Sequence, residues 1–83
     1  MESSMTATLD EIVELVRIQL GAAAVRPEDR LIEDLDAESA DLVNIIAAAE
    51  DRYGITVDEE ELATITTVAE IFEMISGRQG RGG

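Results

Sequence analysis

The sequence predicts an all-α fold, a small bundle of three main helices plus one short helix with a long first loop. The chain has 83 residues, which allows one small domain. Three segments repeat apolar residues at the helical spacing i, i+3, i+4 and i+7, and each is followed by a glycine of the kind that ends helices. We expect the domain to span residues 8–76, with residues 1–7 and 77–83 as flexible ends.

The first helix is expected to begin after Thr8, because Thr8 and Glu11 have the spacing of a capping box. Its apolar stripe consists of Leu9, Ile12, Val13, Val16 and Leu20, with Gly21 at its end. The connection over residues 22–38 is long, and structureless loops beyond about 12–15 residues are uncommon in compact domains. We therefore expect Leu31, Ile32 and Leu35 to hold this loop against the bundle, with one helical turn over residues 28–31.

The second helix is expected to start near Ser39 and to end before Gly54. Its apolar stripe consists of Leu42, Ile45, Ile46, Ala49 and Tyr53. The loop before it carries four acids, namely Glu33, Asp34, Asp36 and Glu38. The sequence thus predicts a serine hydroxyl at the positive end of a helix, surrounded by carboxylates.

Two further helices are expected near the C-terminus. Residues 58–62 suit one or two turns, with acids near the start as the helix dipole prefers. Thr67 and Glu70 repeat the capping-box spacing. The last stripe consists of Val68, Ile71, Phe72 and Ile75, with Gly77 after it.

The charge and composition exclude several classes of function. Nineteen acidic residues against six basic ones give a net charge of −13, which disfavours nucleic acid and anionic membranes as partners. The longest apolar run, residues 45–49, is far shorter than the ~20 residues of a membrane span. No targeting signal is visible, so we expect a cytoplasmic protein. We also expect a monomer. The chain has no cysteine, histidine or lysine, so we expect no catalytic residues and no enzyme activity of its own.

Four blocks of the sequence resemble the acyl carrier protein family. Residues 34–41 read Asp-Leu-Asp-Ala-Glu-Ser-Ala-Asp and are similar to the family signature Asp-Leu-Gly-Ala-Asp-Ser-Leu-Asp. Residues 50–55 resemble the acidic-aromatic-Gly-Ile close of the family's second helix, and residues 58–61 and 65–68 resemble its later helix entries. The resemblance covers roughly Leu9–Ile75. It implies that Ser39 holds a 4′-phosphopantetheine arm, attached by a phosphopantetheinyl transferase, on which acyl groups are carried as thioesters.

The resemblance also implies a docking face and a cargo pocket. Partners would be acyl-transferring, condensing and modifying enzymes with basic docking patches. The docking residues expected are Glu38, Ala40, Asp41, Asn44, Ala47, Glu50 and Asp51. The acyl pocket is expected between Ile45, Ile46, Ala49, Ile71 and Phe72, because Ala49 leaves room on the core stripe. Ala40, Asn44, Ala47 and Arg52 depart from residues common in the family, which favours a dedicated fatty-acid, polyketide or modified-lipid carrier.

Other interpretations stay open from the residues alone. Ser39 also fits an ordinary helix N-cap, although a helix N-terminus equally suits a phosphodiester. The chain could be an unmodified acidic interaction or adaptor domain, or a carrier of aminoacyl or peptidyl groups. Asp34, Asp36 and Glu38 match the first ligand positions of a calcium-binding loop, but Ser39 and Ile45 stand where glycine and glutamate are required, so we expect no metal site.

Overall fold

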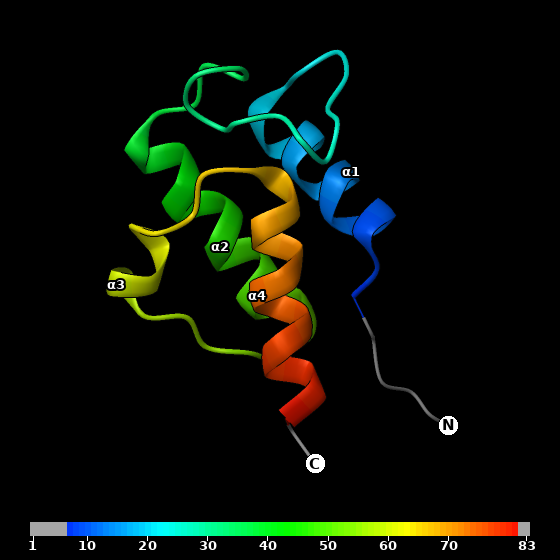
Figure 1. Ribbon diagram of the computed structural model, residues 1–83, viewed down its shortest axis with the longest axis vertical. Coiled ribbons are helices and arrows are strands. Elements are labelled where there is room, and N and C mark those ends of the chain that lie inside the picture. The colour runs from blue at the N-terminus through cyan, green and yellow to red at the C-terminus, as the bar shows by residue number, and fades with distance from the viewer. Residues whose placement is uncertain (1–6, 82–83) are drawn as a thin grey trace.

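The computed structural model describes residues 7–81, which form an all-α bundle (Figure 1). Its helices are α1 (Leu9–Leu20), α2 (Ser39–Tyr53), α3 (Glu59–Leu62) and α4 (Val68–Arg81). Helix α1 packs against both α2 and α4, while the short α3 packs against α2. The predicted fold class, including the long first loop and the short third helix, is confirmed. Each helix in residues 7–81 is too short or too polar to cross a bilayer.

The helix boundaries follow from the capping residues read in the sequence. The Glu11 N–H donates to the Thr8 hydroxyl at 3.2 Å, and the Thr8 N–H donates to the Glu11 carboxylate at 3.4 Å. Thr67 and Glu70 form the same reciprocal pair at the start of α4, at 3.1 and 3.2 Å. Gly21 and Gly54 end α1 and α2 with φ of 66° and 67°, a conformation that costs glycine little.

The core lies where α1, α2 and α4 meet. Its fully enclosed large side chains are Ile12, Val16, Leu31, Ile45, Val68, Ile71 and Ile75. Leu15 is also buried, although the predicted stripe of α1 omitted it, whereas Leu9 of that stripe is half-buried and does not belong to the core cluster. Ala7 is 5% exposed and belongs to the core, so the expectation of a flexible end is wrong at this residue. Residues 1–6 lie outside the described range.

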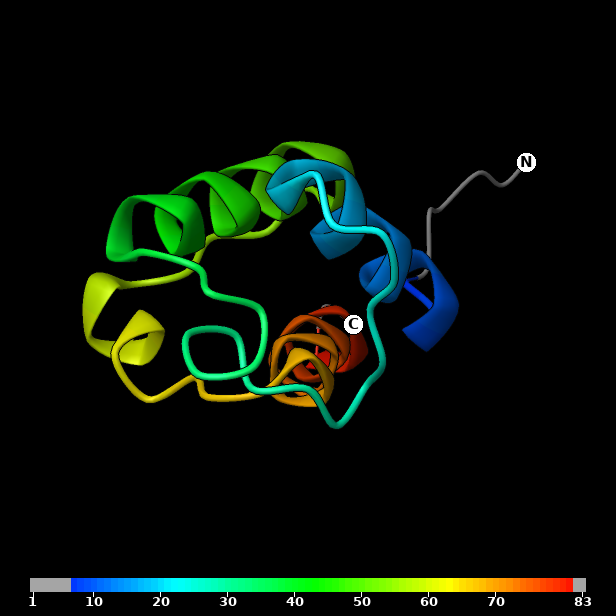
Figure 2. The same ribbon diagram turned by 90° about the horizontal axis from the view of Figure 1, so that it is seen from above.

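The long first loop is held against the start of α4 (Figure 2). The Val68 N–H donates to the Asp29 carbonyl at 3.1 Å, and the Ala69 N–H donates to the Pro27 carbonyl at 2.9 Å. These carbonyls satisfy donors that the first turn of a helix leaves unpaired. The prediction of a helical turn over residues 28–31 is wrong, because Arg30 instead forms an isolated antiparallel β-bridge with Thr67.

The apolar anchors of this loop are only partly those expected. Leu31 is fully buried and Leu35 packs against the core, as predicted. Ile32 is 53% exposed and anchors nothing. Residues 31–35 form turns, and turn geometry sends neighbouring side chains in different directions.

The fourth helix is longer than the sequence suggested. We expected it to end at Gly77, with residues 77–83 as a flexible tail, but α4 continues to Arg81. Glycine inside a helix costs only about 1 kcal/mol, which tertiary contacts can offset. Arg78 supplies such contacts, since its guanidinium donates to the Thr56 carbonyl at 2.8 Å and pairs with Glu61. Residues 82–83 lie outside the described range.

Candidate functional site

Ser39 is the first residue of α2, and its side chain is exposed. The residue before it, Glu38, occupies the N-cap position with extended backbone angles. The Glu38 N–H donates to the Asp41 carboxylate at 2.9 Å, so the Asp41 side chain caps the start of α2. Reading Ser39 as an N-cap is therefore wrong. Its hydroxyl makes no hydrogen bond within the part of the chain that the structure describes.

The backbone around Ser39 presents free donors. The first helical hydrogen bonds return to the Glu38 carbonyl from the N–H groups of Asp41 and Leu42, at 2.9 and 3.2 Å. The N–H groups of Ser39 and Ala40 precede them and have no acceptor among the described residues. Unpaired N–H groups and the partial positive charge of a helix start suit a phosphate group. The site therefore fits a phosphodiester on the Ser39 oxygen.

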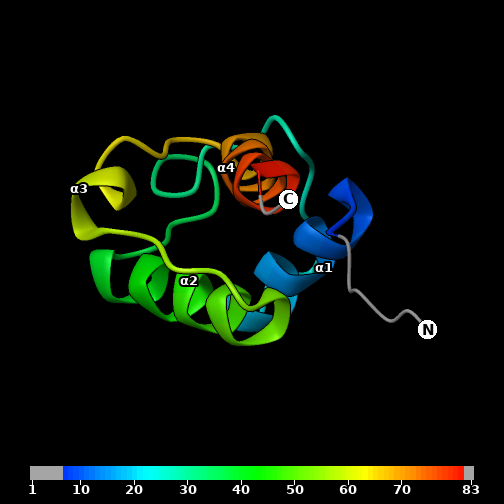
Figure 3. The same cartoon turned by 90° about the horizontal axis from the view of Figure 1, so that it is seen from below.

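A groove between α2 and α3 begins at Ser39. Helix α3 lies beside the first half of α2 (Figure 3). One hollow of about 220 Å³ is lined by Ser39, Leu42, Val43, Glu59, Leu62 and Ala63. The next, of about 190 Å³, is lined by Val43, Ile46, Ala47, Glu50, Val57, Asp58, Glu59 and Leu62. The two share Val43, Glu59 and Leu62, so we treat them as one α2–α3 groove.

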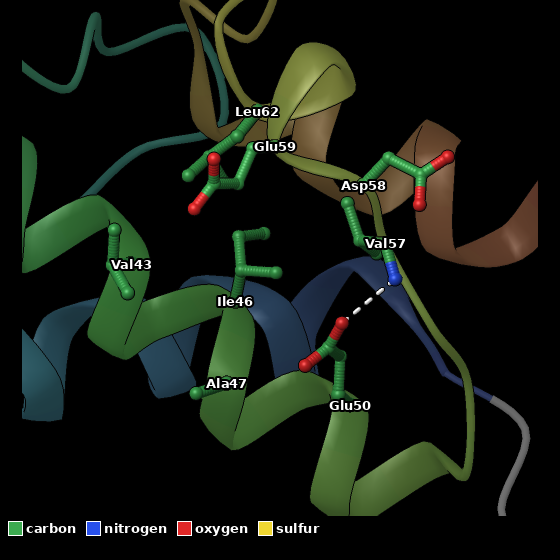
Figure 4. A pocket seen from close by; sticks show the side chains of 8 residues that line it. All are labelled: Val43, Ile46, Ala47, Glu50, Val57, Asp58, Glu59 and Leu62. Atoms are coloured by element: carbon green, nitrogen blue, oxygen red, sulfur yellow. Dashed lines mark hydrogen bonds between the residues drawn. The ribbon is translucent and has the colours of Figure 1, made fainter.

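Three polar contacts hold the far wall of this groove. The Val57 N–H donates to the Glu50 carboxylate at 2.7 Å, which ties the linker before α3 to the side of α2 (Figure 4). Arg78 of α4 binds the Thr56 carbonyl and the Glu61 carboxylate. The guanidinium lowers the pKa of Glu61, with a further contribution from the Asp58 N–H. A four-residue helix is not stable alone, so these contacts position α3.

Comparisons with known proteins give the family. Residues 10–75 match the family model described as the phosphopantetheine attachment site. The chain is 32% identical over 72 residues to the acyl carrier protein of Nitratidesulfovibrio vulgaris, covering 84% of this chain and 95% of that one. It is 35% identical over 85 residues to the acyl carrier protein of Rickettsia typhi, covering 95% and 99%. The chain belongs to the acyl carrier protein family.

The fold of this carrier agrees with that membership. It superimposes on the actinorhodin holo acyl carrier protein of Streptomyces coelicolor with a TM-score of 0.79 at 20% identity, over 98% of this chain and 100% of that one. The family model that matches this chain describes a phosphopantetheine attachment site, so the cofactor is 4′-phosphopantetheine. Acyl carrier proteins interact with phosphopantetheinyl transferases and acyl-handling enzymes, and the family is one of carrier proteins, which are generally non-catalytic.

The carrier's groove is not where the sequence placed the cargo pocket. Of the five expected residues, Ile46 lines the groove. Ile45, Ala49 and Ile71 are enclosed in the core, and Phe72 packs against it. The groove instead uses the neighbouring side of α2, where Ser39, Val43, Ile46 and Glu50 follow one another at i, i+4, i+7 and i+11. That spacing was present in the sequence. The opposing residues on α3, Glu59 and Leu62, had no such signal.

The expected docking residues fall into two groups. Glu38 is exposed, and so are Ala40, Asn44, Ala47 and Asp51, which share one face of α2 at i, i+4, i+7 and i+11. Asp41 and Glu50 are half-buried, because their carboxylates bind the backbone N–H groups of Glu38 and Val57. These two carboxylates therefore hold the backbone around the site in place, in addition to any contact with a partner.

The acidic loop is less negative than its sequence suggests, because Arg30 lies among its acids. Arg30 pairs with Glu33 at 2.5 Å and with Asp34 at 3.3 Å. The pKa of Asp34 is lowered, chiefly by the Arg30 backbone N–H and then by its guanidinium. In residues 7–81 no three acidic side chains come together as a metal-binding group. Asp36 and Glu38 remain as the exposed acids nearest Ser39 in the sequence.

Proposed function

We propose that Ser39 is the attachment point of the 4′-phosphopantetheine arm and that the α2–α3 groove receives the arm's cargo. One observation carries this proposal: Ser39 is exposed and lines the mouth of the groove. A group tethered to its oxygen starts beside the apolar walls formed by Leu42, Val43 and Leu62. When bound, the cofactor supplies a thiol that holds acyl groups as thioesters.

The residues around Ser39 have defined tasks in this function. The N–H groups of Ser39 and Ala40 face a phosphodiester at the helix start and favour its negative charge. Val43 and Leu62 shield apolar cargo from water. Because the chain contains neither lysine nor histidine, we assign removal of the Ser39 hydroxyl proton to the transferase. The carrier therefore contributes display and protection, while its partners perform the chemistry.

We further propose a dedicated carrier for a polyketide, modified-lipid or fatty-acid pathway. Support comes from the docking face of α2, where Ala40, Asn44 and Ala47 are exposed and offer small or neutral side chains. Glu38 and Asp51 frame this face with negative charge. A partner with a basic surface would be attracted to this face by its charge, and apolar contacts would add little to the affinity.

Intact mass after incubation with coenzyme A and a broad-specificity phosphopantetheinyl transferase tests the function. The carrier should gain the mass of one arm, and a reaction without coenzyme A should leave it unchanged. No gain in mass would favour the alternative of an unmodified adaptor with the same fold. The adduct present on protein purified from its own host would then report the cargo.

A further inference from the structure

The α3 wall of the groove carries one carboxylate without a partner. Glu59 lines both hollows, next to Val43 and Leu62. Its carboxylate projects from α3 toward α2, on the side of Val43 and Ile46 (Figure 4). It makes no hydrogen bond or ion pair within the part of the chain that the structure describes.

The other acids of the groove are arranged differently. The Glu50 carboxylate is occupied by the Val57 N–H at 2.7 Å. The Asp58 carboxylate points away from α2 (Figure 4). None of the residues found to line either hollow is basic. Glu59 is therefore the carboxylate that a group lying between Val43 and Leu62 would meet.

An unpaired carboxylate discriminates among cargos by their hydrogen bonding. An ionised carboxylate accepts hydrogen bonds and donates none. A saturated acyl chain beside Glu59 displaces water from it and returns no donor. A keto oxygen or a second carboxylate brings lone pairs against lone pairs. A protonated amine donates a hydrogen bond and also neutralises the charge.

We propose that Glu59 is a specificity-determining residue and that the groove favours acyl groups bearing a protonated amine over saturated and keto cargos. This inference rests on attachment of the arm at Ser39, because only then does the cargo enter the groove from its mouth. The apolar walls hold the carbon skeleton of the cargo, and Glu59 holds its amine.

The test compares three thioesters on three proteins. The parent, Glu59→Gln and Glu60→Gln are each loaded with butyryl, 3-aminobutyryl and 3-oxobutyryl groups, with loading checked by intact mass, and thioester hydrolysis is followed at low ionic strength. Glu60 is the matched control, because it is an exposed glutamate on the same short helix and lines neither hollow. Comparing proteins with the same cargo removes the intrinsic reactivity of each thioester.

The expected result is an acceleration of hydrolysis confined to one cargo. Glu59→Gln should hydrolyse 3-aminobutyryl about two- to fivefold faster than the parent, the size expected for one exposed ion pair. Its butyryl and 3-oxobutyryl rates should not rise, because glutamine removes the charge that disfavours these two cargos. Glu60→Gln should match the parent throughout.

Three results would overturn the inference. Equal rates in parent and Glu59→Gln for every cargo would mean that the amine does not reach this carboxylate. Equal acceleration for every cargo would mean that Glu59 acts on the arm or on α3 itself. A parent chain that takes up no arm would overturn the proposed attachment and this inference together, and intact mass shows that outcome before any rate is measured.

Discussion

The Tyr53 phenol donates a hydrogen bond of 3.1 Å to the Glu11 carboxylate, which links the end of α2 to the start of α1. The same carboxylate oxygen accepts the Thr8 N–H of the α1 cap at 3.4 Å. The Glu11 side chain thus caps α1 and also connects it to α2, through two residues 42 positions apart in sequence. The Tyr53 ring is almost fully buried, at 8% exposure, so the contact lies at the edge of the core.

Tyr53→Phe should destabilise the carrier without changing its fold. The variant keeps the buried ring and loses a hydrogen bond to a carboxylate, which is worth about 1–2 kcal/mol. Urea unfolding of parent and variant measures the difference. Glu11→Gln is the companion variant, because its amide oxygen still accepts both donors, and it should lose less. If Tyr53→Phe is as stable as the parent, the hydrogen bond does not contribute to folding.

The same contact predicts a loss of stability in alkali. Burial raises the pKa of Tyr53 above its ordinary value of about 10, and the Glu11 carboxylate raises it further. A pKa raised by folding gives stability that is complete below pH 10 and is lost as pH rises through the folded value. The chain has one tyrosine and no lysine or cysteine, so no other side chain titrates in this range of pH. Melting temperature from pH 9 to 11 should fall in the parent and stay level in Tyr53→Phe. An equal fall in both would contradict this assignment.

The backbone conformation at Asp36 predicts that substitutions there change the stability of the carrier. Its φ is +60°, in the left-handed region, and it stands where the family signature has glycine. A side chain there costs about 1 kcal/mol or more, although aspartate tolerates it better than most residues. Allowing for the greater unfolded-state entropy of glycine, Asp36→Gly should gain about 0.5–1 kcal/mol. Asp36→Ala removes the same charge but keeps the strain, so it should be the less stable of the two. Thermal unfolding decides, and the reverse order would show that this backbone is not strained.

Removing Arg78 should loosen α3 and with it the far wall of the groove. Arg78→Ala breaks both the hydrogen bond to the Thr56 carbonyl and the ion pair with Glu61. Amide exchange at Leu62 and Ala63, whose N–H groups bond within α3, should speed up by about two- to fivefold. Arg17→Ala, which removes a similar exposed ion pair on α1, should leave these amides unchanged. Unchanged exchange in Arg78→Ala would mean that Glu50 and the apolar contacts suffice.

Local signals in the sequence predicted the helices and the position of Ser39. The capping pairs at Thr8 and Thr67 and the left-handed Gly54 depend on neighbours within a few residues, so spacing alone reveals them. Gly77 misled for the same reason. Its local preference ends a helix, whereas the contacts of Arg78 with Thr56 and Glu61, far away in sequence, continue it.

The groove could be only half predicted. One wall follows from the helical spacing of Val43, Ile46 and Glu50 after Ser39. The other depends on where a four-residue helix comes to rest, which the Glu50–Val57 and Arg78–Glu61 contacts decide. The ion pairs of Arg30 with Glu33 and Asp34 likewise depend on the conformation of the loop, so they could not be predicted from the net charge of the sequence.

The identity of the modified serine is the central claim, and intact mass of two matched variants tests it most directly. Ser39→Ala and Ser76→Ala are incubated with coenzyme A and the transferase beside the parent. Ser76 is a half-buried serine on α4, away from the groove lining, and is the control. The parent and Ser76→Ala should each gain the mass of one arm, while Ser39→Ala should gain nothing and melt at about the parent's temperature. A full mass gain on Ser39→Ala would contradict the account.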